Sequence, residues 1–497
     1  MVDPPTHRSL WLDRPNPIPT DEWNAPGPVD VVILGAGLSG LSAAAMLAAE
    51  GRSVVVLEAR HVGAVTTGNT TGKISLLQGS QLSRIREGVS RDLAEAYVAA
   101  NRAGQDWLMR HIRDNSVPFD ERTAVTYAAT DAGAPTIEAE LDAASDLGLP
   151  VSARHTLELP FDITAAVCLP GQFQVDAMDV LESLVRTVRR LGGLVLEGVR
   201  ATEIDSGSPC IVSTNRGDVR GERVLVATGT PFPKRGGHFA TLEPRRSYAV
   251  GYRWPGHSLE GMYLSVDEPT RTIRDASRSD SRYLVVGGNG HHGGKGAPTQ
   301  PRVDDLMDWT ATRFPDAVPT HVWSAQDYRS TDRLPHFGQI TSGDERVFVA
   351  SGYDKWGLTN GVAAAISIAG RLANARPPWA VTLEDRPPAY TAVGSTLGAG
   401  AQVAADLTHG WVAAELSPDP GTPPAEGEGV VVRDGIAPVA VCTVDGVTRR
   451  RSAVCTHLGG IVSWNGAERS WDCPLHGSRF SPAGDNLEGP AVIPLND

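Results

Sequence analysis

Cysteine is scarce in this 497-residue sequence, and long apolar runs are absent. The five cysteines are too few for a disulfide-based secreted framework and favour a reducing cytoplasm as the location. No stretch reaches the roughly 20 consecutive apolar residues that a membrane-spanning helix needs. Residues 1–28 are polar and proline-rich and lack the apolar core of a signal peptide, so we expect no secretory signal.

Blocks of basic charge are also absent. Lys and Arg number 45 against 58 Asp and Glu, which gives a formal net charge of −13. A chain with this charge and no basic cluster is not expected to bind nucleic acid or an anionic membrane. Hydrophobic residues make up 41% of the sequence, enough for buried cores, and the length predicts two or three domains.

Two of the few cysteines stand beside histidines near the C-terminal end. Cys455-Thr-His457 is followed, after 15 intervening residues, by Cys473-Pro-Leu-His476. In a Rieske [2Fe–2S] centre two thiolates hold one iron and two neutral imidazoles hold the other, which favours the reduced state. These four residues are therefore the predicted cluster ligands, and a Cys₂His₂ zinc site is the alternative. A one-electron carrier at one end of the chain predicts a redox partner elsewhere in it.

A dinucleotide-binding pattern lies near the other end. The apolar run 29–34 predicts a buried parallel strand, and an Ala-rich helical stretch covers 41–49. Between them, Gly35 permits a tight turn, Gly37 lets the backbone approach a pyrophosphate, and Gly40 allows close packing of helix on strand. The helix N-terminus then faces the phosphates with unpaired N–H groups.

The acidic residue that such a site needs is present. A second strand, 53–57, ends at Glu58, whose carboxylate can accept hydrogen bonds from ribose hydroxyls. A second GxGxxG pattern, Gly288 to Gly293, follows the strand-like residues 283–286, but 294–298 cannot start an apolar helix. We predict a Gly-rich loop there, and so the sequence offers no obvious site for NAD(P)H.

Later segments favour a flavin over a nicotinamide. Residues 223–229 form a predicted strand that ends in Ala-Thr-Gly, and a further strand, 345–352, precedes the helical run 362–373. That helix could direct its N-terminus at the flavin pyrimidine ring, where negative charge develops on reduction. Together with 332–338, these segments resemble the D-amino-acid oxidase and glycine/sarcosine oxidase family of FAD enzymes over roughly residues 29–375. Because 455–460 and 473–480 resemble the two Rieske loops, the chain resembles the bacterial subgroup that fuses such a unit to a Rieske domain.

The resemblance implies two cofactors, FAD and a [2Fe–2S] cluster. Asn69 stands near the point where some relatives attach the flavin through a histidine, so we expect FAD to be held non-covalently. Some Rieske proteins carry an extra disulfide between the cluster loops, and here Gly460 and Leu475 occupy its positions. Because that disulfide is absent and the loops are held by packing, we expect a reduction potential low in the range of about −150 to +300 mV. The implied FAD-binding residues are Gly35, Gly37, Leu38, Ser39, Gly40, Glu58, Ala59, Arg60, Thr66, Thr67, Thr70, Thr71, Gly72, Lys73, Thr228, Gly229, Gly352, Trp356, Gly357, Leu358 and Thr359.

We predict an α/β FAD-binding domain of the Rossmann-like, two-dinucleotide type, an α+β substrate domain and a small all-β Rieske domain. The FAD-binding domain is discontinuous and comprises 29–90, 165–235 and 325–380, and the substrate domain comprises 91–164 and 236–324. The remaining segments are an N-terminal extension (1–28), a connecting segment with a helix (381–416), a Pro/Gly-rich linker (417–429) and the Rieske domain (430–497).

The implied activity is hydride transfer to FAD from the carbon beside the nitrogen of a small amine or N-substituted amino acid. Electrons would then leave singly through the cluster to an external carrier such as a ferredoxin. Two alternatives remain open. In the first, an outside reductase feeds the cluster for an oxygen-dependent or reductive step at FAD. In the second, the Rieske domain is a docking or redox-sensing module.

Catalytic residues are harder to select from the sequence. Relatives clamp a substrate carboxylate with Arg or Tyr, for which Arg245, Arg246 and Arg274 are candidates, and Tyr263, Asp327 and Trp356 are further candidates for the pocket. Each candidate also has an ordinary interpretation, as a surface histidine, a core aromatic or a solvated lysine. The candidate catalytic residues are Tyr248, His291, His292, Trp323 and Lys355.

Overall fold

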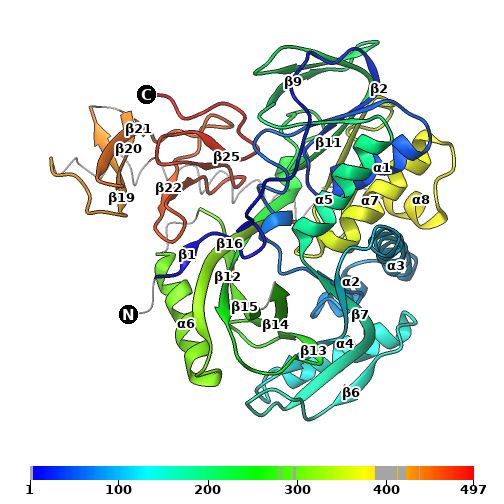
Figure 1. Cartoon of the computed structure of the whole chain (residues 1–497), viewed down its shortest axis with the longest axis vertical. Coiled ribbons are helices and arrows are strands. Elements are labelled where there is room, and N and C mark those ends of the chain that lie inside the picture. Colours follow the sequence, from blue (N-terminus) through cyan, green and yellow to red (C-terminus); the bar gives the residue numbers. More distant parts are fainter. Residues whose placement is uncertain (1–3, 279–280, 295–297, 387–410, 412–420, 436) are drawn as a thin grey trace.

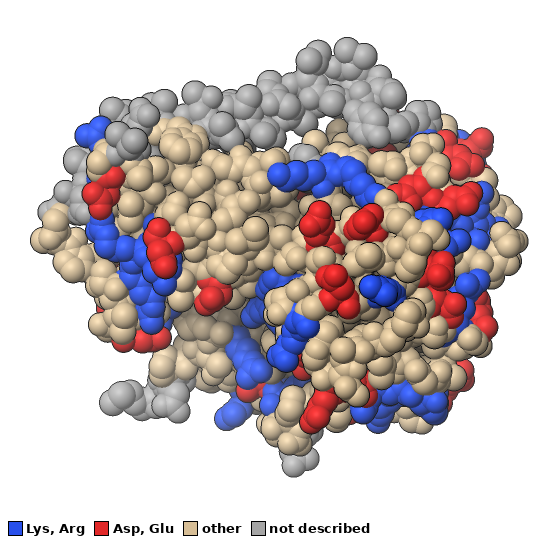
Figure 2. Space-filling view, turned by 90° about the horizontal axis from the view of Figure 1, so that it is seen from above, with Lys and Arg blue, Asp and Glu red and all other residues tan. Residues whose placement is uncertain are grey.

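The computed structural model describes residues 4–278, 281–294, 298–386, 411, 421–435 and 437–497. Figure 1 shows a parallel sheet with its helices, a large mostly antiparallel sheet next to it, and a small β domain formed by the C-terminal residues. None of the described helices combines the length and the apolarity needed to cross a bilayer. On the face shown in Figure 2, acidic and basic side chains are interspersed, and neither sign forms a continuous field.

The parallel sheet forms because its strands are short apolar runs buried on both faces. Val31 and Ile33 point into one core with the helices, while Val32 and Leu34 point into a second core under the hairpin of residues 201–214. The sheet order is β17 (His336–Gln339), β18 (Val347–Ser351), β11 (Val219–Gly229), β2 (Val29–Leu34), β3 (Val54–Leu57) and β8 (Leu194–Leu196), with β9 (Ala201–Asp205) and β10 (Cys210–Thr214) attached to β11. The predicted strand 29–34 coincides with β2.

Three helices pack together on the first of these cores, α1 (Leu38–Ala49), α5 (Ala177–Arg190) and α7 (Gly357–Leu372). Asp176 caps α5, since its Oδ1 accepts a hydrogen bond of 2.8 Å from the backbone N–H of Met178. Further helices are α2 (Gln81–Gly88), α3 (Arg91–Asp114), α4 (Ala134–Asp146), α6 (Gln300–Arg313) and α8 (Pro378–Glu384), and short 3₁₀ turns are η1 (Thr67–Asn69) and η2 (His238–Thr241).

The large sheet provides walls of the candidate site. Its order is β1 (Thr6–His7), β16 (Val318–Ser330), β12 (Leu242–Arg253), β15 (Ser281–His292), β14 (Arg271–Arg278), β13 (Gly261–Ser265), β5 (Phe119–Ala128), β7 (Ala165–Val175) and β4 (Lys73–Ile74), and β6 (Ser152–Arg154) pairs with β7. The sequence predicts segment 165–175 as part of the FAD-binding domain. It lies in the large sheet instead, because β7 pairs with β5 along most of its length.

The predicted Gly-rich loop at 288–293 is also wrong. Residues 288–292 continue strand β15, which pairs with β12 and β14. Glycine is needed here because the strands approach closely: a Cβ on Gly288 would lie 2.1 Å from the carbonyl oxygen of Thr270. The prediction that no nucleotide-binding helix begins at this motif is consistent with the observed strand.

The N-terminal extension is an integral part of the fold. Its strand β1 adds to β16 in parallel, and Leu10 and Trp11 are each only 1% exposed. The Trp11 indole N–H donates to the carbonyl of Thr70 at 2.6 Å, and the Ser9 hydroxyl donates to the carbonyl of Gly68 at 2.6 Å. The extension therefore packs directly against the 66–73 loop.

The C-terminal domain contains two small sheets. One is β19 (Gly429–Asp434), β20 (Ala437–Val444) and β21 (Val447–Ser452), and the other is β22 (Ser463–Asn465), β23 (Ser470–Asp472), β24 (Arg479–Phe480) and β25 (Asn486–Glu488). Most of the predicted connecting segment 381–416 lies outside the described residues, which include only 381–386, where α8 ends at Glu384, and 411. Of the predicted linker 417–429, residues 421–429 are described; they contain no helix, and β19 begins at Gly429. Cys168, Cys210 and Cys442 are buried free thiols, as expected for small core residues.

Candidate functional site

The Gly-rich turn after β2 has the geometry that the sequence predicts. Gly35 has φ +105°, and a Cβ there would lie 2.6 Å from the carbonyl oxygen of Ala227. A Cβ on Gly40 would lie 2.0 Å from the carbonyl oxygen of Gly35, so only glycine lets α1 pack this closely on the turn. Because α1 begins at Leu38, the N–H groups of its first turn, which have no partner within the helix, face the turn.

Glu58 is fixed beside this turn at the end of β3. Its carboxylate accepts hydrogen bonds from the backbone N–H groups of Ala36, at 2.9 Å, and Arg60, at 2.8 Å. Burial raises the pKa of Glu58, and the two hydrogen bonds oppose that rise. The carboxylate is thereby held where a ribose would reach it.

A cavity of about 310 Å³ runs from this turn to the large sheet. This volume lies within the range of small-molecule sites. Most of the predicted FAD-binding residues line it, namely Gly35, Gly37, Leu38, Ser39, Glu58, Ala59, Arg60, Thr66, Thr67, Thr70, Thr71, Lys73, Thr228, Gly229, Trp356, Gly357 and Leu358. Gly40, Gly72, Gly352 and Thr359 are absent from the lining. Sequence reasoning missed other lining residues, among them Val199 and Arg200 after β8, which no local motif marks.

The 66–73 loop is held in place by hydrogen bonds from several elements. The Thr67 hydroxyl accepts the N–H of Leu38 at 3.2 Å, which ties the loop to the start of α1. The indole N–H of Trp323 donates to the carbonyl of Asn69 at 2.9 Å. At the end of the loop, Lys73 donates to the carbonyl of Tyr263 at 2.9 Å, and burial lowers the pKa of Lys73 to about 7. These contacts present hydroxyls and backbone to the cavity.

Helix α7 begins beside α1 at the same cavity. Trp356, Gly357 and Leu358 line it, so the positive end of the helix dipole faces the space. The Tyr353 hydroxyl lies 2.9 Å from the Ser39 hydroxyl, which joins the start of α7 to α1. Two neighbouring helix N-termini therefore face the cavity, an arrangement suited to an anionic, ring-containing dinucleotide such as FAD.

Strands β12 and β16 form the wall at the far end. In their antiparallel register Arg245 lies opposite Asp327, and Arg246 lies opposite Gln326. Successive side chains of a strand point to opposite faces. Arg245 and Asp327 line the cavity, whereas Arg246 and Gln326 are buried on the other side, against the C-terminal domain.

Three charged groups line this end of the cavity. The Asp327 carboxylate accepts the backbone N–H groups of Tyr328, at 2.7 Å, and Lys355, and burial raises the pKa of Asp327 to about 7. Lys355 lies in the loop before α7 and has φ +76°, a left-handed backbone conformation. A Cβ on Gly290 would lie 3.1 Å from both the Lys355 amino group and the Ser247 hydroxyl, so the glycine leaves room for both.

The structure separates the remaining candidates. Trp323 and Tyr248 line the cavity, but the Tyr248 hydroxyl lies 3.2 Å from His291 Nε2, and the two rings stack. His291 and His292 lie outside the lining, at the end of β15. Burial lowers the pKa of His291 to about 4. Of the proposed clamp residues, only Arg245 reaches the cavity.

The other two arginines are engaged elsewhere. Arg274 donates to the carbonyl of Thr71 at 2.7 Å and lies 5.1 Å from the centre of the Trp11 ring, so it supports the loop from behind. Arg246 contacts the C-terminal domain. Tyr263, a further candidate, is buried, and its hydroxyl donates to Glu158.

The four predicted cluster ligands lie on two loops with the same backbone closure. In the first, the N–H of Cys455 donates to the carbonyl of Gly460 at 2.8 Å, and the N–H of Gly459 donates back to Cys455 at 3.0 Å. In the second, the N–H of Cys473 donates to the carbonyl of Ser478 at 2.8 Å, and the N–H of Gly477 donates to the carbonyl of Cys473 at 3.2 Å. Gly459 and Gly477 have φ +76° and +78°, so each loop needs glycine at its fifth position.

The ligands meet as two pairs. The His457 and His476 ring centres are 5.0 Å apart, and a hydrogen bond with Cys473 lowers the pKa of Cys455 to about 7. Among the described residues no single point is surrounded by three or more His, Cys, Asp or Glu side chains suited to one metal ion. Two thiols on one side and two imidazoles on the other suit a binuclear centre with two protein ligands on each iron.

The C-terminal domain also closes the nucleotide cavity. Arg60 donates to the carbonyl of Leu487 at 3.1 Å, and Arg200 donates to the carbonyl of Asn486 at 3.1 Å. Leu487, Glu488, Gly489, Ala491 and Val492 line the same cavity as the Gly-rich turn. One pocket is therefore built from both ends of the chain, a feature that the separate motifs do not reveal.

Comparison with known proteins agrees with this construction. The Rieske 2Fe-2S iron-sulfur protein YhfW of Bacillus subtilis (strain 168) is 27% identical over 471 residues, which cover 94% of this chain and 92% of that protein. Gamma-glutamylputrescine oxidoreductase of Escherichia coli (strain K12) is 22% identical over 377 residues, 71% of this chain and 84% of its own length. The crystal structure of glycine oxidase from Geobacillus kaustophilus has the same fold, with a TM-score of 0.62 at 20% identity over 73% of this chain and all of that one.

Family models cover both parts of the chain. Residues 30–371 match the model described as DAO, FAD dependent oxidoreductase, and residues 422–497 match the Rieske [2Fe-2S] domain. These matches confirm the predicted fold class and both cofactors, FAD and a [2Fe–2S] cluster, and decide against the zinc alternative. The protein is an oxidoreductase that belongs to the DAO family of FAD-dependent enzymes and carries a Rieske domain at its C-terminal end.

Proposed function

We propose that this protein oxidises a small amine or N-substituted amino acid at the carbon beside the nitrogen, and that the electrons leave singly through the Rieske centre to an external carrier such as a ferredoxin. When bound, FAD would supply hydride acceptance and the cluster one-electron transfer. The observation that carries the proposal is the shared wall: β12 and β16 present alternate side chains to the cavity and to the cluster domain.

The charges at the far end of the cavity support an amine substrate with an acidic group. Arg245 and Lys355 are cations that would bind a carboxylate, while Asp327 would accept the N–H of the amine. An amine needs its free lone pair to release a hydride from the neighbouring carbon, so Asp327 would also take up the proton of the ammonium form. The names of two similar proteins, gamma-glutamylputrescine oxidoreductase and glycine oxidase, are consistent with this substrate class.

Anaerobic stopped-flow spectroscopy of the purified holoenzyme tests the proposal. Mixing with a panel of N-methylated amino acids and small polyamine derivatives should bleach the flavin first and the cluster afterwards. A His457→Ala variant without the cluster should still show flavin reduction but should no longer reduce added ferredoxin. If oxygen alone reoxidises the flavin of this variant as fast as that of wild type, electrons do not need to leave through the cluster.

A second candidate role follows from the cavity lining. Because 487–492 form part of the pocket wall, the C-terminal domain could serve to close the pocket without taking part in turnover. Two changes separate these roles. Removal of the domain would open the pocket, whereas His457→Ala leaves the domain in place, so full turnover with every acceptor in His457→Ala would favour a purely structural domain.

A further inference from the structure

Gln326 lies at the junction between the cavity and the cluster. Its side-chain Nε2 donates to the carbonyl of Gly477, at 2.8 Å, and to the hydroxyl of Tyr328, at 2.9 Å. Its own backbone carbonyl accepts the hydroxyl of Thr66 at 2.7 Å. Gly477 follows the cluster ligand His476, and Thr66 lines the cavity on the 66–73 loop. One residue therefore joins the second cluster loop to the flavin side of the wall.

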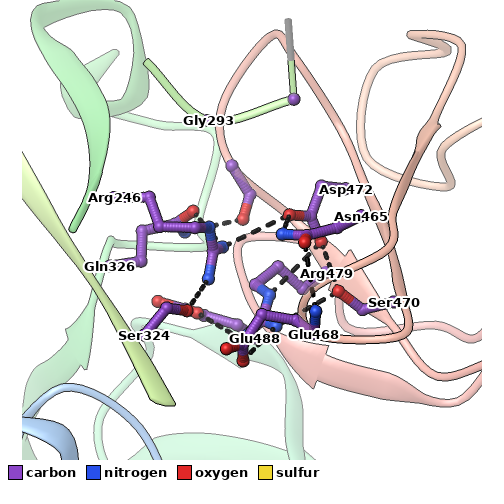
Figure 3. A network of polar contacts seen from close by, with 12 residues as sticks. Arg246, Gly293, Ser324, Gln326, Asn465, Glu468, Ser470, Asp472, Arg479 and Glu488 are labelled. Carbon is purple, nitrogen blue, oxygen red and sulfur yellow. Dashed lines mark hydrogen bonds and ion pairs between the residues drawn. The ribbon is translucent and has the colours of Figure 1, made fainter. Parts of the chain in front are cut away.

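A buried ionic network holds Gln326 in this position. Arg246, which is 0% exposed, donates to the Gln326 carbonyl oxygen Oε1 and to the Ser324 hydroxyl, each at 2.8 Å, and lies 3.5 Å from Asp472. Figure 3 shows these side chains meeting between the two domains, where Arg479 also donates to Asp472. A buried network of this kind fixes its members more firmly than isolated hydrogen bonds would.

We propose that Gln326 is a positioning residue that fixes the second cluster loop against the cavity wall, so that electrons pass between FAD and the cluster along Thr66, Gln326 and the Gly477–His476 backbone. This inference rests on the proposed function. The transfer that it serves moves one electron from reduced FAD to one ferric ion of the cluster, which becomes ferrous. Only two hydrogen bonds, of 2.7 and 2.8 Å, interrupt the covalent route from Thr66 to His476.

The requirements at this position match glutamine. The residue must donate to two oxygens and accept from a guanidinium, which a carboxamide does within one planar group. Glutamate keeps the acceptor for Arg246 but loses both donors, and it would place a carboxylate against the Gly477 carbonyl. Leucine has a similar size but loses all three contacts. These two substitutions therefore remove the link to the cluster loop in different ways.

The test uses the holoenzyme of wild type, Gln326→Leu and Gln326→Glu. Under anaerobic conditions, laser-flash photoreduction with 5-deazariboflavin delivers electrons to the protein, and their redistribution between flavin and cluster is followed in the visible absorption bands. Ser324→Ala is the matched control, because Ser324 also contacts Arg246 on the same face but has no hydrogen bond to Gly477 or Thr66. Both Gln326 variants should transfer electrons at least tenfold more slowly, and Ser324→Ala should remain within twofold of wild type.

Measurements independent of transfer separate positioning from damage to the cluster. The EPR spectrum of the chemically reduced cluster should be unchanged in both variants, and its midpoint potential should be unchanged in Gln326→Leu, while hydrogen exchange of peptide 473–480 should become faster. If Gln326→Leu fails to retain either cofactor, Gln326→Glu carries the same test. Transfer at the wild-type rate in the variants would overturn the role of Gln326 and leave the electron route intact, whereas no exchange between the centres in wild type would overturn the proposed function itself.

Discussion

Single residues on β12 and β16 acquire different roles from the alternation of a strand. Arg245 and Arg246 are adjacent in the sequence, yet one faces a cavity and the other makes a buried ion pair with another domain. The same holds for Gln326 and Asp327. The register of the two strands fixes all four roles at once, so a slip by one residue would exchange them.

Asp327 should make stability depend on pH. Its pKa is about 7 in the folded protein, against about 4 in an unfolded chain, because burial disfavours the charged form. The stabilisation from its protonated form is complete below pH 4 and is lost as the pH rises through 7. The difference between the melting temperature of wild type and that of Asp327→Asn should therefore decrease as the pH is raised from 5 to 8. Thermal unfolding of both proteins at each pH measures this difference, and a constant difference would contradict the assigned pKa.

Gly40→Ala should abolish FAD binding. A Cβ at this position would lie 2.0 Å from the Gly35 carbonyl oxygen, which is backbone and cannot move aside without displacing the turn. Overpacking of this kind costs about 1–3 kcal/mol or more. The flavin absorption per mole of purified protein should be lost. Gly27→Ala is the control, since a Cβ there meets nothing within 4 Å and should leave the flavin content unchanged.

At the level of elements, the N-terminal extension supports the loop that faces the cavity. Its buried Trp11 lies between the Thr70 carbonyl, to which it donates, and the Arg274 guanidinium, which lies over its ring. Arg274 in turn donates to Thr71 and Gly72. The N-terminal extension, which precedes the first strand of the parallel sheet, therefore supports the loop 66–73 through these contacts.

Trp11 substitutions should weaken both stability and FAD retention. Trp11→Ala should lower the free energy of unfolding by about 3–5 kcal/mol, as large core aromatics do. Trp11→Phe keeps most of the buried ring and loses only the hydrogen bond to Thr70, so a loss of about 0.5–1.5 kcal/mol is expected. Denaturant unfolding and the rate of FAD release during dialysis measure the two effects. Equal behaviour of both variants would show that the ring does not brace the loop.

Elements marked by local sequence could be predicted, and those set by distant contacts could not. Strand 29–34, the Gly-rich turn and Glu58 follow from patterns within about 30 residues of one another. The strand at 288–292 was missed because its glycines serve close strand pairing, which depends on the partner strands. Val199, Arg200 and the 487–492 wall join the cavity only through tertiary packing, so no motif identifies them.

At the level of the whole molecule, the cluster domain is docked by buried polar contacts. Besides Arg246 and Asp472, the Thr299 hydroxyl donates to Asn465 at 2.8 Å, and the Ser463 hydroxyl donates to the Gly294 carbonyl at 2.9 Å. A Cβ on Gly294 would lie 2.5 Å from the backbone nitrogen of Pro474, next to the ligand Cys473. These contacts hold the second cluster loop against the large sheet.

Removal of Arg246 should release this domain. Asp472 would then lose its partner across the interface and keep only Arg479 as a charged partner, and Ser324 and Gln326 would lose their charged donor. Each hydrogen bond to a charged group contributes about 1.5–3 kcal/mol. Arg246→Met should therefore lower the unfolding midpoint and split calorimetric unfolding into two transitions, because the domains no longer stabilise each other. Arg450→Met is the control, since Arg450 pairs with Asp434 at an exposed site within the C-terminal domain and should cost at most about 1 kcal/mol. A single transition at the wild-type midpoint in Arg246→Met would show that the interface is held by its remaining contacts.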